Sequence, residues 1–302
     1  MAASRSPLNY TGNKSCLIPQ ILALMPAHET YIEPCMGSAE VFFCKPPSQL
    51  EILNDYNGDL VRFFRTLQNN MKLSLLLGRL YLSVNSEQLF QENQALLAST
   101  PNLLDDLNST AEMADCLSWK EIRQAAAFLE NQFYSFSSTG QSYGIAARDL
   151  TARLRRIAAV YGRLRNAVIL HRDYKDAIRY AAGPKTFIFL DPPYRGTEDY
   201  YPKGDFTEDE HAELFLLLGD LDQTYEGACK FLVTYNNDPY IRALAEQHGF
   251  QTSVVSRLDN MRQSKGGGTQ YEELLITNYD QQEQAAKNRQ VVSMEQAQFS
   301  LF

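Results

Sequence analysis

The tetrapeptide Asp191-Pro192-Pro193-Tyr194 carries the residue types best suited to chemistry. It follows a continuous apolar run, Phe187 to Leu190, which is typical of a buried strand. Because two prolines cannot extend a central strand, the chain must leave the sheet there. The pattern places a carboxylate and an aromatic ring at the C-terminal end of a strand, where α/β proteins bind ligands. A simple strand-ending turn is the alternative interpretation.

Two further turns follow strand-like segments near the N-terminus. Thr30 to Ile32 leads into Glu33-Pro34-Cys35-Met36-Gly37-Ser38, where Gly37 would let a ligand approach the backbone. Glu51 to Leu53 leads into Asp55, whose carboxylate suits either a ribose diol or a helix N-cap. The first turn lacks the G-x-G-x-x-G pattern, so it predicts no dinucleotide site and is otherwise an ordinary β–α turn.

The segment Pro7 to Ser15 contains Gly12-Asn13-Lys14-Ser15, which resembles a phosphate-binding loop only superficially. Asn13 separates Gly12 from Lys14, and no glycine lies five positions before Gly12. Nucleotide hydrolysis is therefore excluded.

The elements that position these residues alternate between strands and helices. Strand-like segments are expected at 30–32, 51–53, 167–170, 186–190, 230–234, 252–256 and 273–277, with helices near 39–43, 208–221 and 239–248. This order predicts an α/β fold with a mainly parallel sheet and helices on both faces. A mostly helical block, 59–165, separates the second and third strands and is long enough to be an inserted domain. The polar segment 280–302 is expected to be a flexible tail or a frayed helix.

Charge is unevenly distributed along the 302 residues, of which 44% are hydrophobic and 21% charged. The net charge is −8, which alone argues against a nucleic-acid partner. However, the window from Arg148 to Arg179 holds nine basic and three acidic residues, which leaves it at +6 and the remainder at −14. Such a window forms either a basic face for a polyanion or a solvated helix surface.

Within the helical block, Tyr134 to Gly144 alternates aromatic and hydroxyl residues around Gly140. This pattern is typical of a hairpin or an extended loop, which we expect near 134–147. A basic helix, Thr151 to Leu164, follows it.

Four blocks, in this order, resemble the Dam-type (α-group) DNA adenine-amino methyltransferases. They are Pro7 to Lys14, Glu33 to Phe42, Asn54-Asp55-x-Asn57, and the unaltered tetrapeptide Asp191 to Tyr194. Weaker similarity extends the likeness over roughly residues 5 to 279. One departure is Ala39, which stands where the family usually has a second glycine; we expect weaker or shifted cofactor contact there.

The resemblance implies a catalytic methyltransferase domain formed by 1–58 and 166–279, and a helical target-recognition domain at 59–165. It implies transfer of a methyl group from S-adenosyl-L-methionine to the amino nitrogen of a flipped-out adenine in double-stranded DNA. The implied catalytic residues are Asp191, Pro192, Pro193 and Tyr194. The implied cofactor contacts are Tyr10, Lys14, Glu33, Pro34, Gly37, Ser38, Asp55, Asp173 and Tyr174, although Lys14 and Glu33 would also make a structural ion pair.

DNA contacts are expected on the hairpin and on the basic helix that follows it. The candidate residues are Tyr134, Ser135, Ser137, Thr139, Gln141, Tyr143, Arg153, Arg155 and Arg156. Hydroxyl and amide groups would read base edges and the arginines would hold phosphates, unless the hairpin is only a solvent-exposed loop. Two other functions stay open: a methyltransferase for RNA or a protein glutamine, which also use Asp/Asn-Pro-Pro-Tyr sites, and a catalytically silent DNA-binding relative.

The last five residues, Gln298, Phe299, Ser300, Leu301 and Phe302, resemble the short motif by which bacterial replication proteins bind the sliding clamp. The tail folding onto its own domain and a chance match are the alternatives.

The five cysteines and four histidines lack ligand spacing, so we expect reduced thiols and no metal. With no long apolar run, we expect no membrane contact and a cytoplasmic, nucleoid-associated monomer.

Overall fold

The structure is a computed structural model of the chain, and it describes residues 5–10, 12, 14–99, 119–196, 206–258 and 270–299. By internal contacts the chain divides into two compact units. The first comprises residues 1–13, 36–46 and 53–174, and the second comprises 14–35, 47–52 and 175–302. None of the helices described is long and apolar enough to cross a membrane.

One seven-stranded sheet has the order β3-β2-β1-β4-β5-β7-β6. Its strands are β1 (Thr30–Glu33), β2 (Leu50–Asn54), β3 (Val168–Leu170), β4 (Thr186–Leu190), β5 (Lys230–Asn236), β6 (Gln251–Leu258) and β7 (Gln270–Thr277). Strand β4 is parallel to β1 and β5, whereas β7 is antiparallel to β5 and β6. The α/β fold predicted from the alternation is confirmed, with a mixed sheet rather than a wholly parallel one.

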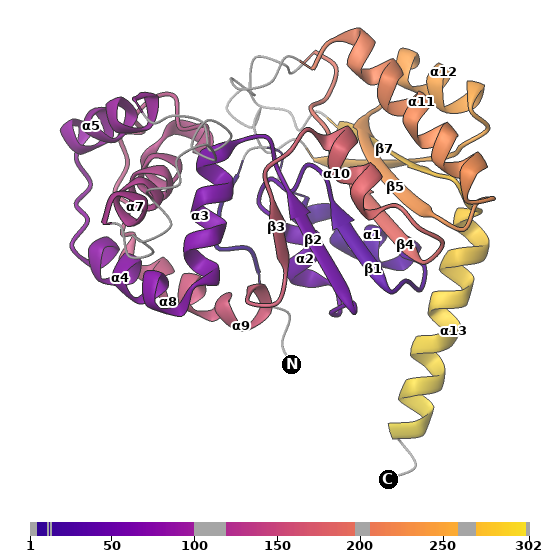
Figure 1. Ribbon diagram of the computed structural model, residues 1–302, viewed down its shortest axis with the longest axis horizontal. Helices are drawn as coiled ribbons and strands as arrows, with labels where there is room; N and C mark the ends of the chain where they lie inside the picture. Colours follow the sequence, from indigo (N-terminus) through magenta and orange to yellow (C-terminus); the bar gives the residue numbers. More distant parts are fainter. Residues whose placement is uncertain are drawn as a thin grey trace. The chain divides into compact units, whose positions relative to one another are not determined.

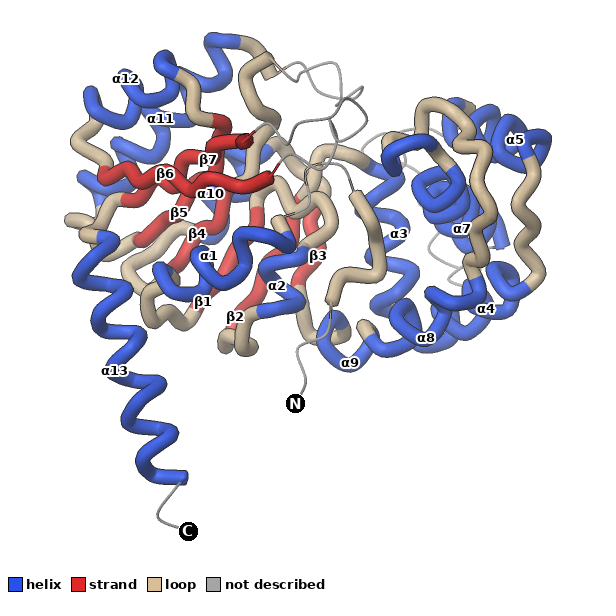
Figure 2. The backbone as a smooth tube through the Cα atoms, turned by 180° about the vertical axis from the view of Figure 1, so that it is seen from behind, coloured by secondary structure: helices blue, strands red, loops and turns tan. Residues whose placement is uncertain are grey.

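The second unit covers its strands with helices on both faces. Helices α10 (Tyr174–Ala181) and α11 (Glu208–Thr224) lie on one face of β4 and β5, and α1 (Ile18–Leu24) lies on the other (Figures 1 and 2). Because both faces are covered, every residue of β4 is buried, which explains its uninterrupted apolar sequence. Helix α12 (Pro239–Gln247) connects β5 to β6 and starts at Asp238, whose carboxylate caps its first turn.

The first unit is mainly helical. It contains α2 (Glu40–Cys44), α3 (Gly58–Gln68), α4 (Asn70–Tyr81), α5 (Glu87–Ala98), α7 (Trp119–Tyr134), α8 (Thr151–Ala159) and α9 (Tyr161–Leu164). Helix α7 packs against α3, α4 and α5 and forms the centre of this group (Figure 1). The basic helix expected at 151–164 is therefore two helices, with a break at Val160.

The C-terminal segment differs from the expected flexible tail, since Gln281–Phe299 forms the helix α13. Its first half packs against α1. Asn288 Nδ2 donates to the carbonyl oxygens of Ala23 at 2.8 Å and Met25 at 3.0 Å. These carbonyls belong to the last turn of α1, which has no further helical turn to bond them. Ser300, Leu301 and Phe302 lie outside the described residues.

Candidate active site

Asp191 lies directly after β4, where two side chains contact its carboxylate. Thr234 follows Val233, the β5 partner of Leu190, and its hydroxyl donates to Asp191 Oδ1 at 2.8 Å. Lys14 Nζ lies 2.6 Å from the other carboxylate oxygen. Since proline has no N–H, Pro192 and Pro193 end the ladder here and add only carbonyl acceptors. The prediction that this tetrapeptide leaves the sheet at a strand end is confirmed.

The surroundings of Asp191 act on its pKa in opposite directions. Burial raises the pKa above the usual aspartate value, while the Lys14 ammonium and the Thr234 hydroxyl oppose that rise. The nearby Glu273 carboxylate raises it further. The Asp191 side chain is still 23% exposed, whereas that of Lys14 is only 7% exposed. Asp191 thus remains accessible to accept hydrogen bonds from a ligand.

Tyr194 is held in place from two sides. Its hydroxyl donates to Glu273 Oε2 at 3.2 Å, and Glu273 lies on β7 opposite Asn236 of β5. The Tyr194 ring lies 5.8 Å from the Tyr235 ring, and Lys14 Nζ lies 4.9 Å above it. Thr234 and Glu273 were not predicted as site residues. The only sequence signal for Glu273 is a carboxylate at the head of an otherwise apolar run, Leu274 to Ile276.

The turn after β1 divides between the two units, and each part is ordered locally. In the second unit, Glu33 is 1% exposed and accepts a hydrogen bond from the Tyr31 hydroxyl at 2.6 Å, with buried Pro34 following it. In the first unit, the Ser38 carbonyl accepts from the Ser6 hydroxyl at 2.6 Å. The N-terminal segment is thereby tied to this turn.

Gly37 and Ala39 both adopt left-handed backbone conformations, with φ of 47° and 53°. Gly37 tolerates this conformation because it has no Cβ. Ala39, which occupies the place of the family's second glycine, is held there at the start of α2 and is fully buried. A left-handed backbone explains why glycine would suit position 39.

Asp55 accepts a backbone N–H on each carboxylate oxygen, from Gly37 at 3.0 Å and from Asn57 at 2.9 Å. Burial raises the pKa of Asp55 to about 6, although these backbone donors oppose the rise. The helix cap itself is Asn57, whose side chain accepts from the first turn of α3. A backbone hydrogen bond from Tyr56 also reaches this carboxylate, which still has acceptor capacity for a ribose hydroxyl.

Tyr10 and the segment around Asp173 belong to the same unit as Asp55. Asn57 Nδ2 donates to the Tyr10 hydroxyl at 3.4 Å, and burial raises the pKa of Tyr10. The Asn54 side chain exchanges two hydrogen bonds with the backbone of Arg172, at 2.9 and 3.0 Å. This exchange ties the end of β2 to the chain immediately before Asp173 and Tyr174.

The expected hairpin contains a single bridge, Ser135 to Tyr143, around the short helix Phe136–Ser138. Tyr134 and Ser135 are buried, and the Ser135 hydroxyl accepts from Gly140 N at 2.9 Å. Their location favours a supporting role within the loop. The predicted readers that reach the surface are Thr139, Gln141 and Tyr143; nothing is described of the Ser137 side chain.

The hairpin also exposes two apolar side chains that sequence reasoning missed. Phe136 is 67% exposed and Ile145 is 97% exposed. An amphipathic pattern would have assigned both to the core. Single exposed apolar side chains are common on protein surfaces, so these two do not mark a binding site by themselves.

The predicted phosphate contacts all lie on α8. Arg155 and Arg156 are exposed, and Arg153 is half-buried. By contrast, the Arg163 side chain is bonded within the protein. It donates to the Phe42 carbonyl at 2.9 Å, and its guanidinium carbon lies 3.8 Å from the centre of the Phe42 ring. Lys175 pairs with Glu210 and Glu213. Only part of the basic window is therefore available to a polyanion.

Among the residues described, no cluster of three or more potential ligands could hold a metal ion.

Comparisons with known proteins agree with this geometry. Residues 10–261 match the D12 class N6 adenine-specific DNA methyltransferase family, and the chain belongs to that family. It is 28% identical over 266 residues to a DNA N-6-adenine-methyltransferase of Escherichia phage P1, covering 83% of this chain and 32% of that protein. It is 22% identical over 284 residues to the type II methyltransferase M1.LlaDCHI of Lactococcus lactis subsp. cremoris, covering 89% and 94% of the two chains. The chain thus spans about a third of the length of the phage relative.

Proposed function

We propose that this protein transfers the methyl group of S-adenosyl-L-methionine to the exocyclic amino nitrogen of adenine in DNA. The observation that carries the proposal is the accessible Asp191 carboxylate at the end of β4, oriented by Lys14 and Thr234, in a chain of this family. The family and the name of the phage relative support DNA as the substrate and adenine as the base.

The chemistry follows from the acceptors that this loop presents. The adenine amino nitrogen is a poor nucleophile because its lone pair is delocalised into the ring. Hydrogen bonds donated by this amino group to the Asp191 carboxylate and the Pro192 carbonyl would shift the nitrogen toward sp3 geometry and orient its lone pair. The bound cofactor supplies a methyl group on a sulfonium centre. Positioning and electrostatics then provide most of the rate enhancement.

The target adenine must leave the DNA duplex before these acceptors can reach it. Tyr194 offers a ring, fixed through Glu273, on which the flipped base would stack. Such stacking contributes about 1–3 kcal/mol per base.

We further propose that the cofactor contacts are the residues implied by the family resemblance. Asp55 would accept the ribose hydroxyls, and Gly37 would let the cofactor approach the backbone closely. The other proposed contacts are Tyr10, Lys14, Glu33, Pro34, Ser38, Asp173 and Tyr174.

The test is methyl transfer from radiolabelled cofactor to DNA, RNA and protein substrates. Asp191→Ala should abolish transfer to DNA without unfolding the protein, because the residue lies at a strand end rather than in the core. Asp209→Ala, which removes an exposed carboxylate on α11, is the matched control and should retain full activity. Preferential methylation of RNA or protein would support an alternative substrate, and near-normal turnover by Asp191→Ala would refute the assignment. Calorimetric binding of the cofactor separates an enzyme from a silent relative.

We propose that the hairpin and α8 contact the DNA. The exposed Gln141 and the half-buried Thr139 would read base edges, and Arg155 and Arg156 would hold phosphates. Alanine substitutions in the hairpin should change the preferred DNA sequence. Alanine substitutions at the arginines should weaken binding to all DNA sequences by the same factor. Hairpin variants that keep both specificity and affinity would contradict this assignment. A monomer acting on DNA in the cytoplasm fits this mode of action.

The C-terminal pentapeptide gives a second proposed partner, the bacterial sliding clamp. Leu301 and Phe302 would fill an apolar pocket and Gln298 would bond at its rim, so that the enzyme is concentrated on newly replicated DNA. A titration against the clamp compares the full chain with one lacking residues 298–302. Loss of binding on truncation, with unchanged methylation of short naked DNA, is expected. Equal binding by both chains, or by neither, would refute it.

A further inference from the structure

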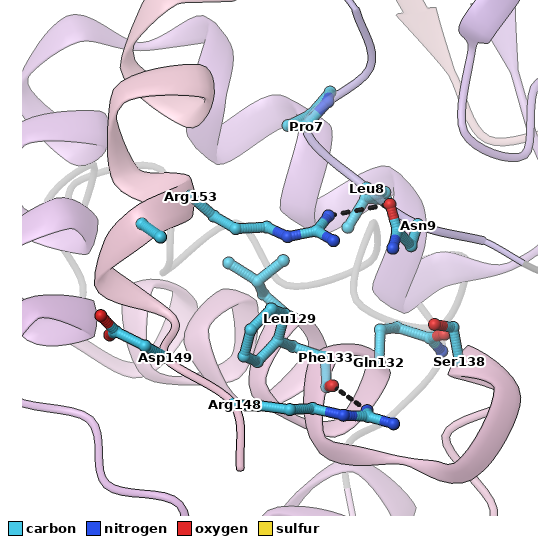
Figure 3. Close-up of a pocket in the computed structure, with 11 residues that line it drawn as sticks. Pro7, Leu8, Asn9, Leu129, Gln132, Phe133, Ser138, Arg148, Asp149 and Arg153 are labelled. Atoms are coloured by element: carbon cyan, nitrogen blue, oxygen red, sulfur yellow. Dashed lines mark hydrogen bonds between the residues drawn. The ribbon is translucent and has the colours of Figure 1, made fainter. Parts of the chain in front are cut away.

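A cavity of about 400 Å³ lies within the first unit, and the described residues that line it include none of the proposed cofactor contacts (Figure 3). Three segments form its wall: the N-terminal stretch Pro7 to Asn9, the last turns of α7, and the start of α8. Leu129 and Phe133 of α7 supply an apolar and aromatic surface. Its volume is in the range of roughly 300–1,000 Å³ that is usual for small-ligand sites.

Two guanidinium groups border this surface. Arg153 Nη1 donates to Asn9 Oδ1 at 2.8 Å, and the guanidinium carbon lies 5.3 Å from the centre of the Phe133 ring. Arg148 Nη1 donates to the carbonyl oxygens of Phe133 and, at 2.8 Å, Ser135. Each guanidinium has five N–H donors, so both keep donors beyond these contacts.

Among the lining residues described, the two arginines outnumber the single carboxylate, that of Asp149. The Asp149 carboxylate accepts from Thr151 N at 2.9 Å and Thr151 Oγ1 at 2.6 Å, and it points away from the two arginines (Figure 3). Burial lowers the pKa of Arg153, and the neighbouring charges of Arg156 and Arg148 lower it further. An anionic ligand would relieve this repulsion.

We propose that the cavity holds one nucleotide of the DNA substrate, with its phosphate bound by Arg148 and Arg153 and its base against Phe133. The inference deepens the proposed function and rests on it. Planar guanidinium forks match phosphate oxygens, and an aromatic ring on an apolar floor accepts any base by stacking. Asn9, exposed at the rim, has an amide that can reach a base edge. One bound nucleotide would thereby contact the N-terminal segment and the helices α7 and α8 together.

The test measures affinity for a fluorescent DNA duplex by anisotropy, together with methyl transfer, in the full chain. Arg153→Gln should weaken binding about tenfold or more, because it removes a charge-assisted contact. Phe133→Leu keeps the floor apolar but removes the ring, and should weaken binding about fivefold or more. Arg123→Gln, an exposed arginine on α7 outside the cavity, is the matched control and should bind within about twofold of the unaltered chain.

Each outcome decides the proposal. Equal losses in Arg153→Gln and Arg155→Gln, with none in Phe133→Leu, would show general surface attraction and overturn it, as would unchanged binding by both cavity variants. Arg153→Lys keeps the charge but not the planar fork, and replaces Arg153→Gln if that variant fails to melt like the parent protein. An unaltered chain that neither binds nor methylates DNA would instead refute the proposed function.

Discussion

At the scale of single residues, the proposed contact of Asp55 with the cofactor predicts that binding depends on pH. Burial raises the pKa of Asp55 in the free protein to about 6, so much of it is protonated below pH 6. Ribose hydroxyls donating to the ionised carboxylate would lower this pKa on binding. The proposed contact would therefore be present above pH 6 and lost as the pH falls through that value.

We therefore expect the affinity for the cofactor to fall between pH 7 and pH 5, approaching about tenfold per pH unit at the acid end. Isothermal titration calorimetry across this range measures the effect. Asp55→Asn should bind more weakly but with little pH dependence over the same interval. A flat affinity profile in the unaltered protein would contradict the assigned contact.

Glu273 has two separable effects on the catalytic loop: it accepts the Tyr194 hydroxyl, and its charge raises the pKa of Asp191. Glu273→Gln keeps an acceptor and removes the charge. Since the proposed mechanism needs ionised Asp191, the acid limb of the pH–kcat profile should move to lower pH in this variant. Glu273→Ala should instead lose the support of Tyr194 and lower kcat at every pH.

The control for this pair is Glu272→Gln, which removes a neighbouring exposed carboxylate bonded to Asn237. It should leave the pH profile in place. An unmoved acid limb in Glu273→Gln would show that Glu273 does not act on Asp191.

At the scale of elements, α13 stabilises the protein through Asn288, which bonds the last carbonyls of α1. Asn288→Ala should cost about 1 kcal/mol, which corresponds to a fall in Tm of about 2 °C in a protein of this size. Differential scanning fluorimetry measures the shift. Arg289→Ala, the exposed neighbour, should leave Tm unchanged, and equal shifts in both variants would mean that the Asn288 hydrogen bonds are not responsible.

Sequence patterns predicted the strands better than they predicted α13 and the partners of Asp191. Strands such as β4 are fully buried apolar runs bounded by turn residues, and their pattern is local. Helix α13 has no apolar stripe, and its anchor is a contact between Asn288 and Ala23, 265 positions away. Thr234 is 43 positions from Asp191, and Glu273 is 79 from Tyr194. Strand register brings Thr234 to Asp191 and Glu273 to Tyr194, and this register cannot be deduced from local periodicity.

At the scale of the whole molecule, an acidic protein must bind DNA through a local concentration of basic residues. The net charge of −8 opposes approach to a polyanion, and the exposed arginines of α8 must compensate for it. Binding should therefore weaken steeply with salt, because phosphate contacts release counterions.

Replacing Arg153, Arg155 and Arg156 together with glutamine should reduce the slope of log K against log salt by about three. Titrations at several salt concentrations give this slope. Arg179→Gln, an exposed arginine paired with Asp176, should leave the slope as it is. An unchanged slope in the triple variant would place the phosphate contacts elsewhere.

The ion pair between Lys14 and Asp191 has a consequence for turnover. In the free protein the Asp191 carboxylate already accepts a hydrogen bond from Lys14 Nζ at 2.6 Å, so its charge is paired before any base arrives. An incoming adenine amino group would donate to a lone pair that Lys14 leaves open on this carboxylate, so that Lys14 stays in place throughout. A charge-assisted bond from an ammonium is stronger than one from a neutral amino group, so the proposed contact to the base would be the weaker of the two. The methylated product, with one N–H fewer to donate, would then be held less tightly than the substrate.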